Sequence, residues 1–222
     1  MPVMTYLNGN PVLGILGAGR AGTAFARLAL KGGYSVLIAN SRGPESMSLM
    51  VEVLMPGAVA GTSEEVAARS DIVLLAVPLG KYRTIPAGRL SGKIVIDAMN
   101  YWAIGGGILS EFEGSSQRSS EKVKAFLPGS RVVKTLNHMG YRELEEEGLP
   151  AGAPGRRALA LAGDDPDAGM IVAGLISDLG FDSLDAGPLS EGWRFAPGSP
   201  VFGGTFSLEE LQRALNQAVL AL

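Results

Sequence analysis

A doubly wound, mainly parallel α/β sheet is the fold class that the sequence predicts, and three features predict it. Short apolar runs recur along the chain without alternating in polarity, which is typical of strands buried on both faces. Segments with the composition and capping signals of helices separate these runs. The chain has 222 residues, of which 46% are hydrophobic. That length and composition suit a single folded domain and exclude a disordered chain.

The first half alternates strand and helix in the order of a parallel sheet. A helix is expected over residues 21–31, because this Ala- and Leu-rich segment is followed by two glycines. A second helix is expected from Pro44 to about Met55, with the proline in its first turn. A third is expected to begin at the capping-box sequence Thr62-Ser63-Glu64-Glu65. The expected strands are residues 12–16, 35–39, 72–77 and 93–97.

The second half continues the pattern and ends in a small C-terminal extension. Asp165 and Pro166 are expected to cap a helix that runs through Leu179. A terminal helix is expected after the capping box at Ser207, with Leu208, Leu211 and Leu215 on one face. Residues 103–120, rich in Gly and Ser, are expected to form a loop. The expected strands are residues 131–135, 157–162 and 182–185. We expect residues 1–222 to form one domain, with residues 181–222 as an extension that helps to form a substrate cleft and a dimer.

Composition excludes several function classes. The chain has no cysteine and a single histidine, which rules out disulfides, thiolate metal sites and multi-histidine metal centres; no metal site is expected. The 19 basic and 22 acidic side chains give a net charge of −3, which argues against nucleic-acid binding. The N-terminal residues show neither a signal peptide nor a long apolar stretch, so we expect a cytoplasmic protein that does not enter a membrane.

The sequence Gly17-Ala18-Gly19-Arg20-Ala21-Gly22 stands directly between the first strand and the first helix. At this spacing the first glycine permits a tight turn, the second lets a pyrophosphate approach the backbone, and the third lets helix and strand pack closely. The helix N-terminus offers free N–H groups to the anion. The loop therefore predicts a dinucleotide site in a Rossmann-type fold, and a glycine-rich turn that binds nothing is the alternative.

The end of the second strand indicates which dinucleotide binds. An NAD site usually has Asp or Glu there to bind the ribose 2′-OH, whereas this chain has Asn40-Ser41-Arg42. An arginine and two small polar side chains would accept a 2′-phosphate. Arg20 could add a second positive charge. We therefore predict NADP as the cofactor.

Further candidate residues follow the later strands, at the edge where parallel sheets bind ligands. Ala76, Val77 and Pro78 are expected beside the nicotinamide ring. Asn100, Asn137 and His138 are candidates for orienting or protonating a substrate, since His138 is the only imidazole available for acid–base chemistry. A histidine that is structural or merely exposed is the alternative. Tyr101 and Trp102 could stack on a planar substrate or pack in the core.

Together these segments resemble the NADP-dependent reductases related to the coenzyme F420:NADP oxidoreductase. The resemblance rests on the glycine loop, on Asn40-Ser41-Arg42, on residues 71–78, on residues 132–137 and on Ala186-Gly187-Pro188-Leu189. It implies that residues 17–22, Ser41 and Arg42 hold NADP, that Val77 and Pro78 lie beside the nicotinamide, and that the enzyme is a homodimer. Residues 103–120 and 191–195, and Glu45 and Ser46 near the expected 2′-phosphate, depart from the family pattern.

The leading functional hypothesis is an NADPH-dependent oxidoreductase that transfers a hydride to or from a deazaflavin (coenzyme F420) or flavin-like small molecule. Hydride transfer needs few catalytic side chains because the cofactor carries the chemistry, which fits a chain with no cysteine and one histidine. Two alternatives stay open: an NADPH-dependent reductase of a small imine or carbonyl compound, and a non-catalytic NADP-sensing module.

Overall fold

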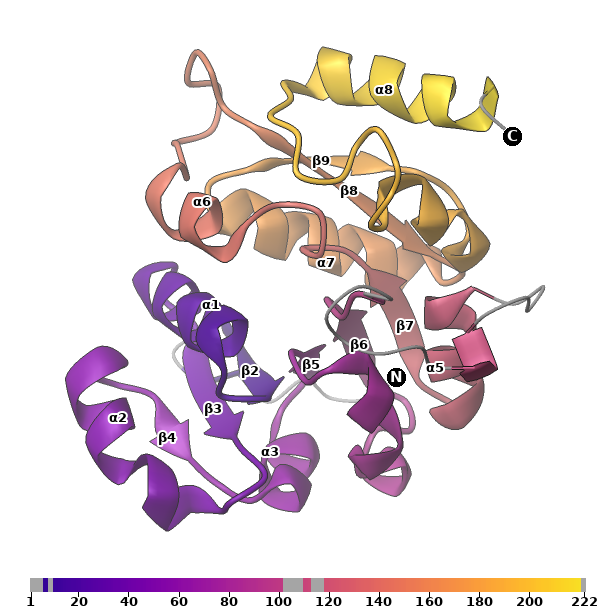
Figure 1. The fold of residues 1–222 in the computed structure, drawn as a ribbon. Helices are drawn as coiled ribbons and strands as arrows, with labels where there is room; N and C mark the ends of the chain where they lie inside the picture. Colours follow the sequence, from indigo (N-terminus) through magenta and orange to yellow (C-terminus); the bar gives the residue numbers. More distant parts are fainter. Residues whose placement is uncertain (1–5, 8–9, 102–109, 113–117, 221–222) are drawn as a thin grey trace.

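The computed structural model describes residues 6–7, 10–101, 110–112 and 118–220. Within them the chain forms one nine-stranded, mostly parallel sheet with helices on its faces (Figure 1). This confirms the predicted α/β, Rossmann-type fold class.

Six parallel strands make up the first part of the sheet, in the order β4-β3-β2-β5-β6-β7. This is the 3-2-1-4-5-6 order of a dinucleotide-binding sheet. The short β1 (Tyr6–Leu7) pairs with β2 in antiparallel fashion. The six strands are β2 (Asn10–Leu16), β3 (Ser35–Ala39), β4 (Val59–Ala60), β5 (Ile72–Leu75), β6 (Ile94–Asp97) and β7 (Arg131–Lys134). Strand β5 stops two residues before the predicted end, and β4 was not predicted.

The helices lie where the sequence signals place them, with one addition. Thr62 and Glu65 form the predicted capping box, with the Glu65 N–H donating to Thr62 Oγ1 at 3.2 Å. Helix α6 contains most of the acidic run 143–147, whose composition is typical of a solvated helix face, whereas helix α5 was not predicted. Because α5 includes Ser119 and Ser120, the loop expected over residues 103–120 ends earlier than predicted. Most of that loop lies outside the described residues. The α-helices are α1 (Arg20–Lys31), α2 (Ser48–Leu54), α3 (Ser63–Arg69), α5 (Ser119–Phe126), α6 (Tyr141–Glu146), α7 (Pro166–Asp178) and α8 (Leu208–Leu220).

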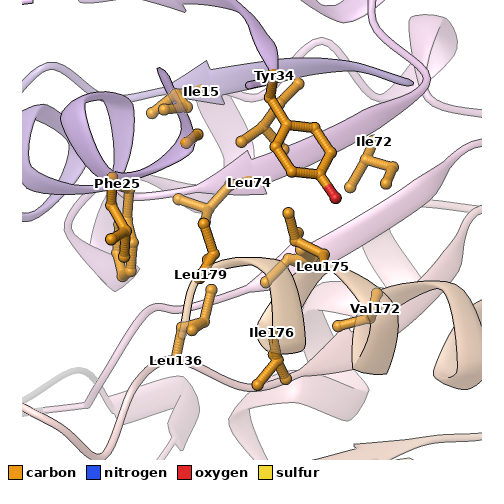
Figure 2. Packing of buried hydrophobic residues seen from close by; sticks show 14 of the residues in the cluster. Ile15, Phe25, Tyr34, Ile72, Leu74, Leu136, Val172, Leu175, Ile176 and Leu179 are labelled. Atoms are coloured by element: carbon orange, nitrogen blue, oxygen red, sulfur yellow. The ribbon is translucent and has the colours of Figure 1, made fainter. Parts of the chain in front are cut away.

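Side chains on both faces of the parallel strands are buried, which explains why the strands read as continuous apolar runs. Leu13 and Ile15 of β2 belong to a core formed with α1 and α7, to which Phe25 and Leu175 contribute (Figure 2). Residues of β2 that point the other way, such as Val12, belong to a second core with α3 and α5. The two cores hold the carboxyl ends of the strands at one fixed edge.

The sheet reverses direction after β7. Strand β8 (Ala158–Gly163) pairs with β7 in antiparallel fashion, and β9 (Asp182–Asp185) then runs parallel to β8. Helix α8 packs on β8 and β9 through a third core that includes Leu211 and Leu215 (Figure 1). Leu208 was predicted on the same buried face but is 42% exposed, because it is the first residue of the helix. The Ser207 capping box forms as predicted.

A membrane-spanning helix, long and apolar enough to cross a bilayer, is not found among the described residues.

Candidate functional site

The turn between β2 and α1 uses its three glycines for different reasons. Gly17 has a φ of +116°, and a Cβ there would lie 2.4 Å from the carbonyl oxygen of Ala76. A Cβ on Gly22 would lie 1.8 Å from the carbonyl oxygen of Gly17, so helix and strand pack too closely for a side chain. A Cβ on Gly19 would meet no atom within 4 Å. Gly17 and Gly22 are required by the fold itself, whereas Gly19 leaves the backbone open to a ligand.

The N-terminus of α1 has the properties of an anion site. Gly19 occupies the N-cap position, no side chain caps the helix, and its first turn contains no acid. The first N–H groups of a helix lack intrahelical partners, and the helix dipole favours negative charge beside them. Arg20 is exposed at this end, while Ala18 and Ala21 are half-buried against the core. The residues present therefore fit a pyrophosphate.

The end of β3 carries polar groups on an ordered turn. Asn40 Oδ1 accepts a hydrogen bond from the Arg42 N–H at 2.8 Å, and Asn40 Nδ2 donates to Ser46 Oγ at 2.9 Å. Ser41 and Arg42 are exposed. Among the described residues, no acid forms an ion pair with the Arg42 guanidinium. This positive charge is available to a ligand.

A cavity of about 580 Å³, which we call the glycine-loop cavity, joins three of the predicted segments. Gly17, Asn40, Ser41 and Val77 line it, so the structure brings together the ends of β2, β3 and β5. Arg42 stands in the sequence between Ser41 and Gly43, which both line this cavity. Half-buried Ala76 contacts the glycine turn, and exposed Pro78 begins the next segment.

A second cavity, of about 430 Å³, lies at the ends of β6 and β7, and we call it the aromatic cavity. Tyr101, Phe112 and Trp193 contribute aromatic rings to its lining. The Tyr101 and Phe112 ring centroids are 5.7 Å apart, and the Arg118 guanidinium lies 5.3 Å from the centroid of the Trp193 ring. Trp102 lies outside the described residues.

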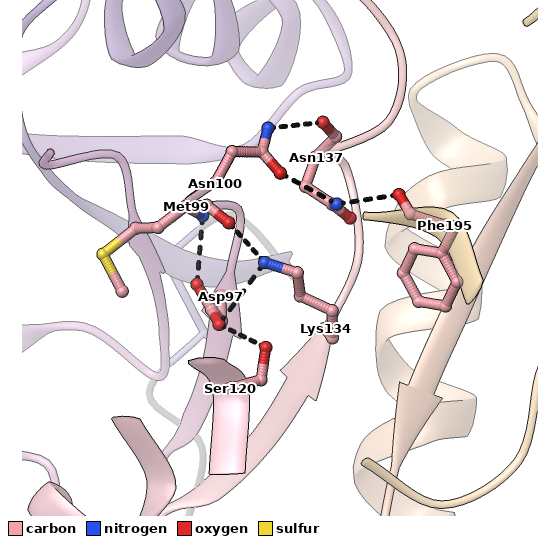
Figure 3. A network of polar contacts seen from close by, with 7 residues as sticks. All are labelled: Asp97, Met99, Asn100, Ser120, Lys134, Asn137 and Phe195. Atoms are coloured by element: carbon pink, nitrogen blue, oxygen red, sulfur yellow. Dashed lines mark hydrogen bonds and ion pairs between the residues drawn. The ribbon is translucent and has the colours of Figure 1, made fainter. Parts of the chain in front are cut away.

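A buried ion pair joins Lys134, one of the lining residues of the aromatic cavity, to Asp97 (Figure 3). Lys134 and Asp97 are cross-strand partners at the ends of β7 and β6, and Lys134 Nζ lies 3.5 Å from Asp97 Oδ2. Lys134 Nζ also donates to the Met99 carbonyl oxygen, while Asp97 accepts hydrogen bonds from the Met99 N–H at 3.0 Å and from Ser120 Oγ at 2.7 Å. Burial lowers the pKa of Lys134, and the charge of Asp97 opposes this.

Asn100 and Asn137 come together as a pair. Asn100 Nδ2 donates to the Asn137 carbonyl oxygen at 2.7 Å, and Asn137 Nδ2 donates to Asn100 Oδ1 at 3.1 Å and to the Phe195 carbonyl oxygen at 3.1 Å (Figure 3). Asn100 lines the aromatic cavity and Asn137 is buried behind it. Leu136, which precedes Asn137, has a φ of +62°, the left-handed conformation that non-glycine residues rarely adopt.

His138 lines neither cavity. It is 2% exposed, its Nε2 accepts a hydrogen bond from the Ala160 N–H at 3.2 Å, and its ring lies 5.3 Å from the Phe195 ring. Burial, with smaller contributions from the charges of Lys134 and Arg157, lowers its pKa to about 3. The imidazole is therefore neutral at physiological pH.

Sequence reasoning did not select Lys134, Ser120 or Arg118. The signal for Lys134 was present, because a lysine and an aspartate end two neighbouring apolar runs and a buried charge requires a partner. Gly192 and Trp193, in the segment that departs from the family pattern, line the aromatic cavity.

Comparison with known proteins yields one matching family model. Residues 12–101 match the model described as NADP oxidoreductase, coenzyme F420-dependent.

Relatives of known sequence or structure extend the similarity over most of the chain. A solved structure of a hypothetical protein, SMa0349 from Sinorhizobium meliloti, is 32% identical, with a TM-score of 0.78 over 89% of this chain and 95% of that one. A candidate F420-dependent NADP reductase from Arthrobacter sp. FB24 has a TM-score of 0.73 at 23% identity, over 89% of this chain and all (100%) of that one, which shows a shared fold. The metalloreductase STEAP3 of Rattus norvegicus is 29% identical over 186 residues, or 81% of this chain. The chain spans 34% of STEAP3 and 51% of a second curated relative.

Proposed function

Because the chain belongs to the family of NADP oxidoreductases described as coenzyme F420-dependent, we propose that it transfers a hydride between NADPH and a flavin-like or deazaflavin acceptor. One observation carries this proposal. The open glycine turn at the end of β2 and the aromatic cavity at the ends of β6 and β7 lie on the same edge of one parallel sheet. That edge is where such sheets bind ligands.

In this proposal the backbone of residues 17–22 binds the pyrophosphate, with Arg20 near it. Gly19 admits the phosphates because no atom fills the space that a side chain would occupy. Asn40 holds the turn that presents Ser41 and Arg42 to the 2′-phosphate. Ala76, Val77 and Pro78 carry the chain from β5 toward β6, so that the nicotinamide would lie near the entrance of the aromatic cavity.

The acceptor would occupy the aromatic cavity. The bound nicotinamide supplies the hydride chemistry. Asn100 is the group that we expect to contact the acceptor, and Asn137 is a positioning residue that holds the Asn100 amide through two hydrogen bonds. We assign His138 a structural role, since it is neutral and buried away from both cavities.

The cofactor assignment is tested with Arg42→Ala. A charge-assisted hydrogen bond contributes about 1.5–3 kcal/mol, so NADPH affinity should fall by about tenfold or more. NADH affinity should change little, because NADH has no 2′-phosphate. Arg142→Ala, at an exposed arginine of α6 that lines neither cavity, is the matched control. Equal losses for NADPH and NADH, measured by fluorescence titration, contradict the assignment.

Gly19→Ala separates cofactor binding from folding. We expect its thermal unfolding to match that of the unmodified protein, because the added methyl group meets no protein atom. Its NADPH affinity should nevertheless drop, since the methyl group occupies the space assigned to the pyrophosphate. Unchanged NADPH affinity would remove the glycine loop from the cofactor site.

Acceptor class is tested by the decay of NADPH absorbance with a deazaflavin, flavin mononucleotide, a ferric chelate and a cyclic imine in turn. The proposal expects turnover with the deazaflavin or the flavin. NADPH binding without turnover across the whole panel would favour a sensing module. The homodimer implied by the family resemblance is a further prediction, and light scattering on the purified protein measures it directly.

A further inference from the structure

We propose that the buried ion pair of Asp97 and Lys134 is a positioning device for Asn100, which it holds at the wall of the aromatic cavity with one amide N–H free for a ligand. This inference deepens the proposed function, on which it rests, because it adds two positioning residues behind the group that we expect to contact the acceptor. It is carried by the hydrogen bonds that hold the chain directly after β6.

The main chain after β6 is held by the two side chains of the ion pair. Asp97 Oδ1 accepts a hydrogen bond from the Met99 N–H at 3.0 Å, and Lys134 Nζ donates to the Met99 carbonyl oxygen (Figure 3). That carbonyl belongs to the planar peptide unit that joins Met99 to Asn100. Rotation of this unit would break the bond to Lys134, so the ammonium group fixes the backbone from which the Asn100 side chain projects.

The ion pair itself has little freedom to move. Asp97 is 0% exposed and Lys134 is 2% exposed, and they are cross-strand partners in β6 and β7. Ser120 Oγ donates at 2.7 Å to Asp97 Oδ2, the same oxygen that lies 3.5 Å from Lys134 Nζ. Desolvation offsets much of the Coulombic gain of a buried ion pair, so stability alone is a weak reason for one to occur here. What the pair adds is a fixed geometry at the ends of two strands.

Asn100 is also held through its side chain, by the segment that contains Lys134. Asn100 Nδ2 donates to the Asn137 carbonyl oxygen at 2.7 Å, and Asn100 Oδ1 accepts from Asn137 Nδ2 at 3.1 Å. Lys134 and Asn137 therefore bind two successive residues, Met99 and Asn100. Between them Leu136 has a φ of +62°, a conformation that persists only where the surrounding contacts impose it.

These contacts leave part of the Asn100 amide unused. The Nδ2 group has two N–H bonds, of which Asn137 accepts one, and among the described residues nothing accepts the other. Asn100 lines the aromatic cavity. A donor that is already fixed loses little rotamer freedom when a ligand binds. The arrangement therefore suits an acceptor molecule with a carbonyl oxygen on its ring system.

A matched pair of lysine variants separates positioning from stability. Lys134→Met/Asp97→Asn removes the ion pair without leaving a buried charge unpaired. Lys93→Met is the control, because Lys93 directly precedes β6 and its Nζ also donates to main-chain carbonyl oxygens, those of Ala68 at 2.9 Å and Ser70 at 2.5 Å. Both changes remove a lysine that binds the main chain, but only the first acts at the carboxyl end of the strand.

The first readout is the exchange of side-chain NH₂ protons with water, measured by NMR on the isotope-labelled full chain without cofactor. In the unmodified protein the Asn100 NH₂ group should exchange about tenfold more slowly than that of Asn216, which is exposed on α8. The double variant should raise the Asn100 rate about tenfold, whereas Lys93→Met should leave it within about twofold. Equal rates at Asn100 and Asn216 in the unmodified protein would overturn the inference without any variant having to fold. An Asn100 rate that the double variant does not change would overturn it too.

Turnover with flavin mononucleotide is the second readout. The double variant should lower kcat about tenfold while the KM for NADPH stays within about twofold, and Lys93→Met should change neither. Adding Asn100→Ala to the double variant should cause no further loss, because the pair acts through Asn100. Losses that multiply in the combined variant, or a normal kcat in the double variant, would overturn the positioning role. Faster Asn100 exchange in the double variant, with no turnover by the unmodified protein, would support that role and refute the proposed function instead.

Discussion

His138 gives the sharpest quantitative prediction, because its environment makes stability depend on pH through one side chain. The imidazole is buried, accepts a hydrogen bond from the Ala160 N–H and packs edge-on against Phe195. Burial lowers its pKa in the folded protein to about 3, from 6.5 in an unfolded chain. The perturbation is His138→Gln, which keeps an oxygen that can accept from Ala160 and removes the titration.

The sign and size of the effect follow from the two pKa values. Between pH 6.5 and pH 3 the unfolded chain binds a proton at this site that the folded protein excludes, so stability falls as the pH falls. At pH 5, about 1.5 pH units below the unfolded pKa, the cost is about 2 kcal/mol, since each unit corresponds to about 1.4 kcal/mol. Well above pH 6.5 the imidazole is neutral in both the folded and the unfolded protein, so this cost to stability disappears.

The assay is urea unfolding of the unmodified protein and of His138→Gln at pH 8 and pH 5, followed by tryptophan fluorescence. Carboxylates titrate in both proteins, so the comparison isolates the histidine. We expect the unmodified protein to lose about 2 kcal/mol more than the variant between the two pH values. An equal loss in both would refute the claim that the imidazole is held neutral. Acid–base chemistry by His138 would be supported instead if the variant also lost turnover at neutral pH without losing stability.

Three further substitutions test the packing and charge arguments. Gly22→Ala places a methyl group against the Gly17 carbonyl oxygen and should lower the unfolding free energy by about 1–3 kcal/mol, measured in urea; an unchanged midpoint would mean that helix and strand can separate at no cost. Lys134→Met leaves Asp97 buried without its cation and should cost about 3–5 kcal/mol, most of it recovered in the double variant with Asp97→Asn. Thr62→Ala removes a helix cap and should lower stability by about 1 kcal/mol in the same assay.

The parallel half of the sheet was predictable because its strands and its glycine turn are each specified by a short stretch of sequence. Strands such as β5 and β6 are buried on both faces and therefore read as unbroken apolar runs, and the glycine turn has a spacing that few other structures require. The reversal at β8 was not predictable, since a short apolar strand has the same composition in either direction. Strand β4 has only two residues, which are too few to show a polarity pattern that would predict a strand.

The candidate site, too, was predictable from the sequence only in part. Gly17, Asn40, Ser41 and Val77 were selected from sequence and line one cavity, because each follows a strand of the same edge. The aromatic cavity is assembled from segments far apart in the chain, so its members could be named only once the packing was known. His138 was selected because it is the single histidine, but chemical type alone does not reveal that the side chain is enclosed.

The position of the antiparallel strand β8 bears on which parts of the chain determine cofactor and acceptor preference. It pairs with β7 through only two residue pairs, so most of its length extends past the carboxyl end of β7. The segment 189–200 and α8 contact β8 and contribute residues to the lining of the aromatic cavity. The matched family model ends at Tyr101, before all of these residues. Under the proposed function, the residues that bind the cofactor lie within the matched region, whereas the acceptor meets Asn100 and Tyr101 from that region together with residues that follow it. Mutation can exchange one partner molecule while the other is conserved, and relatives that share the first hundred residues need not share a substrate.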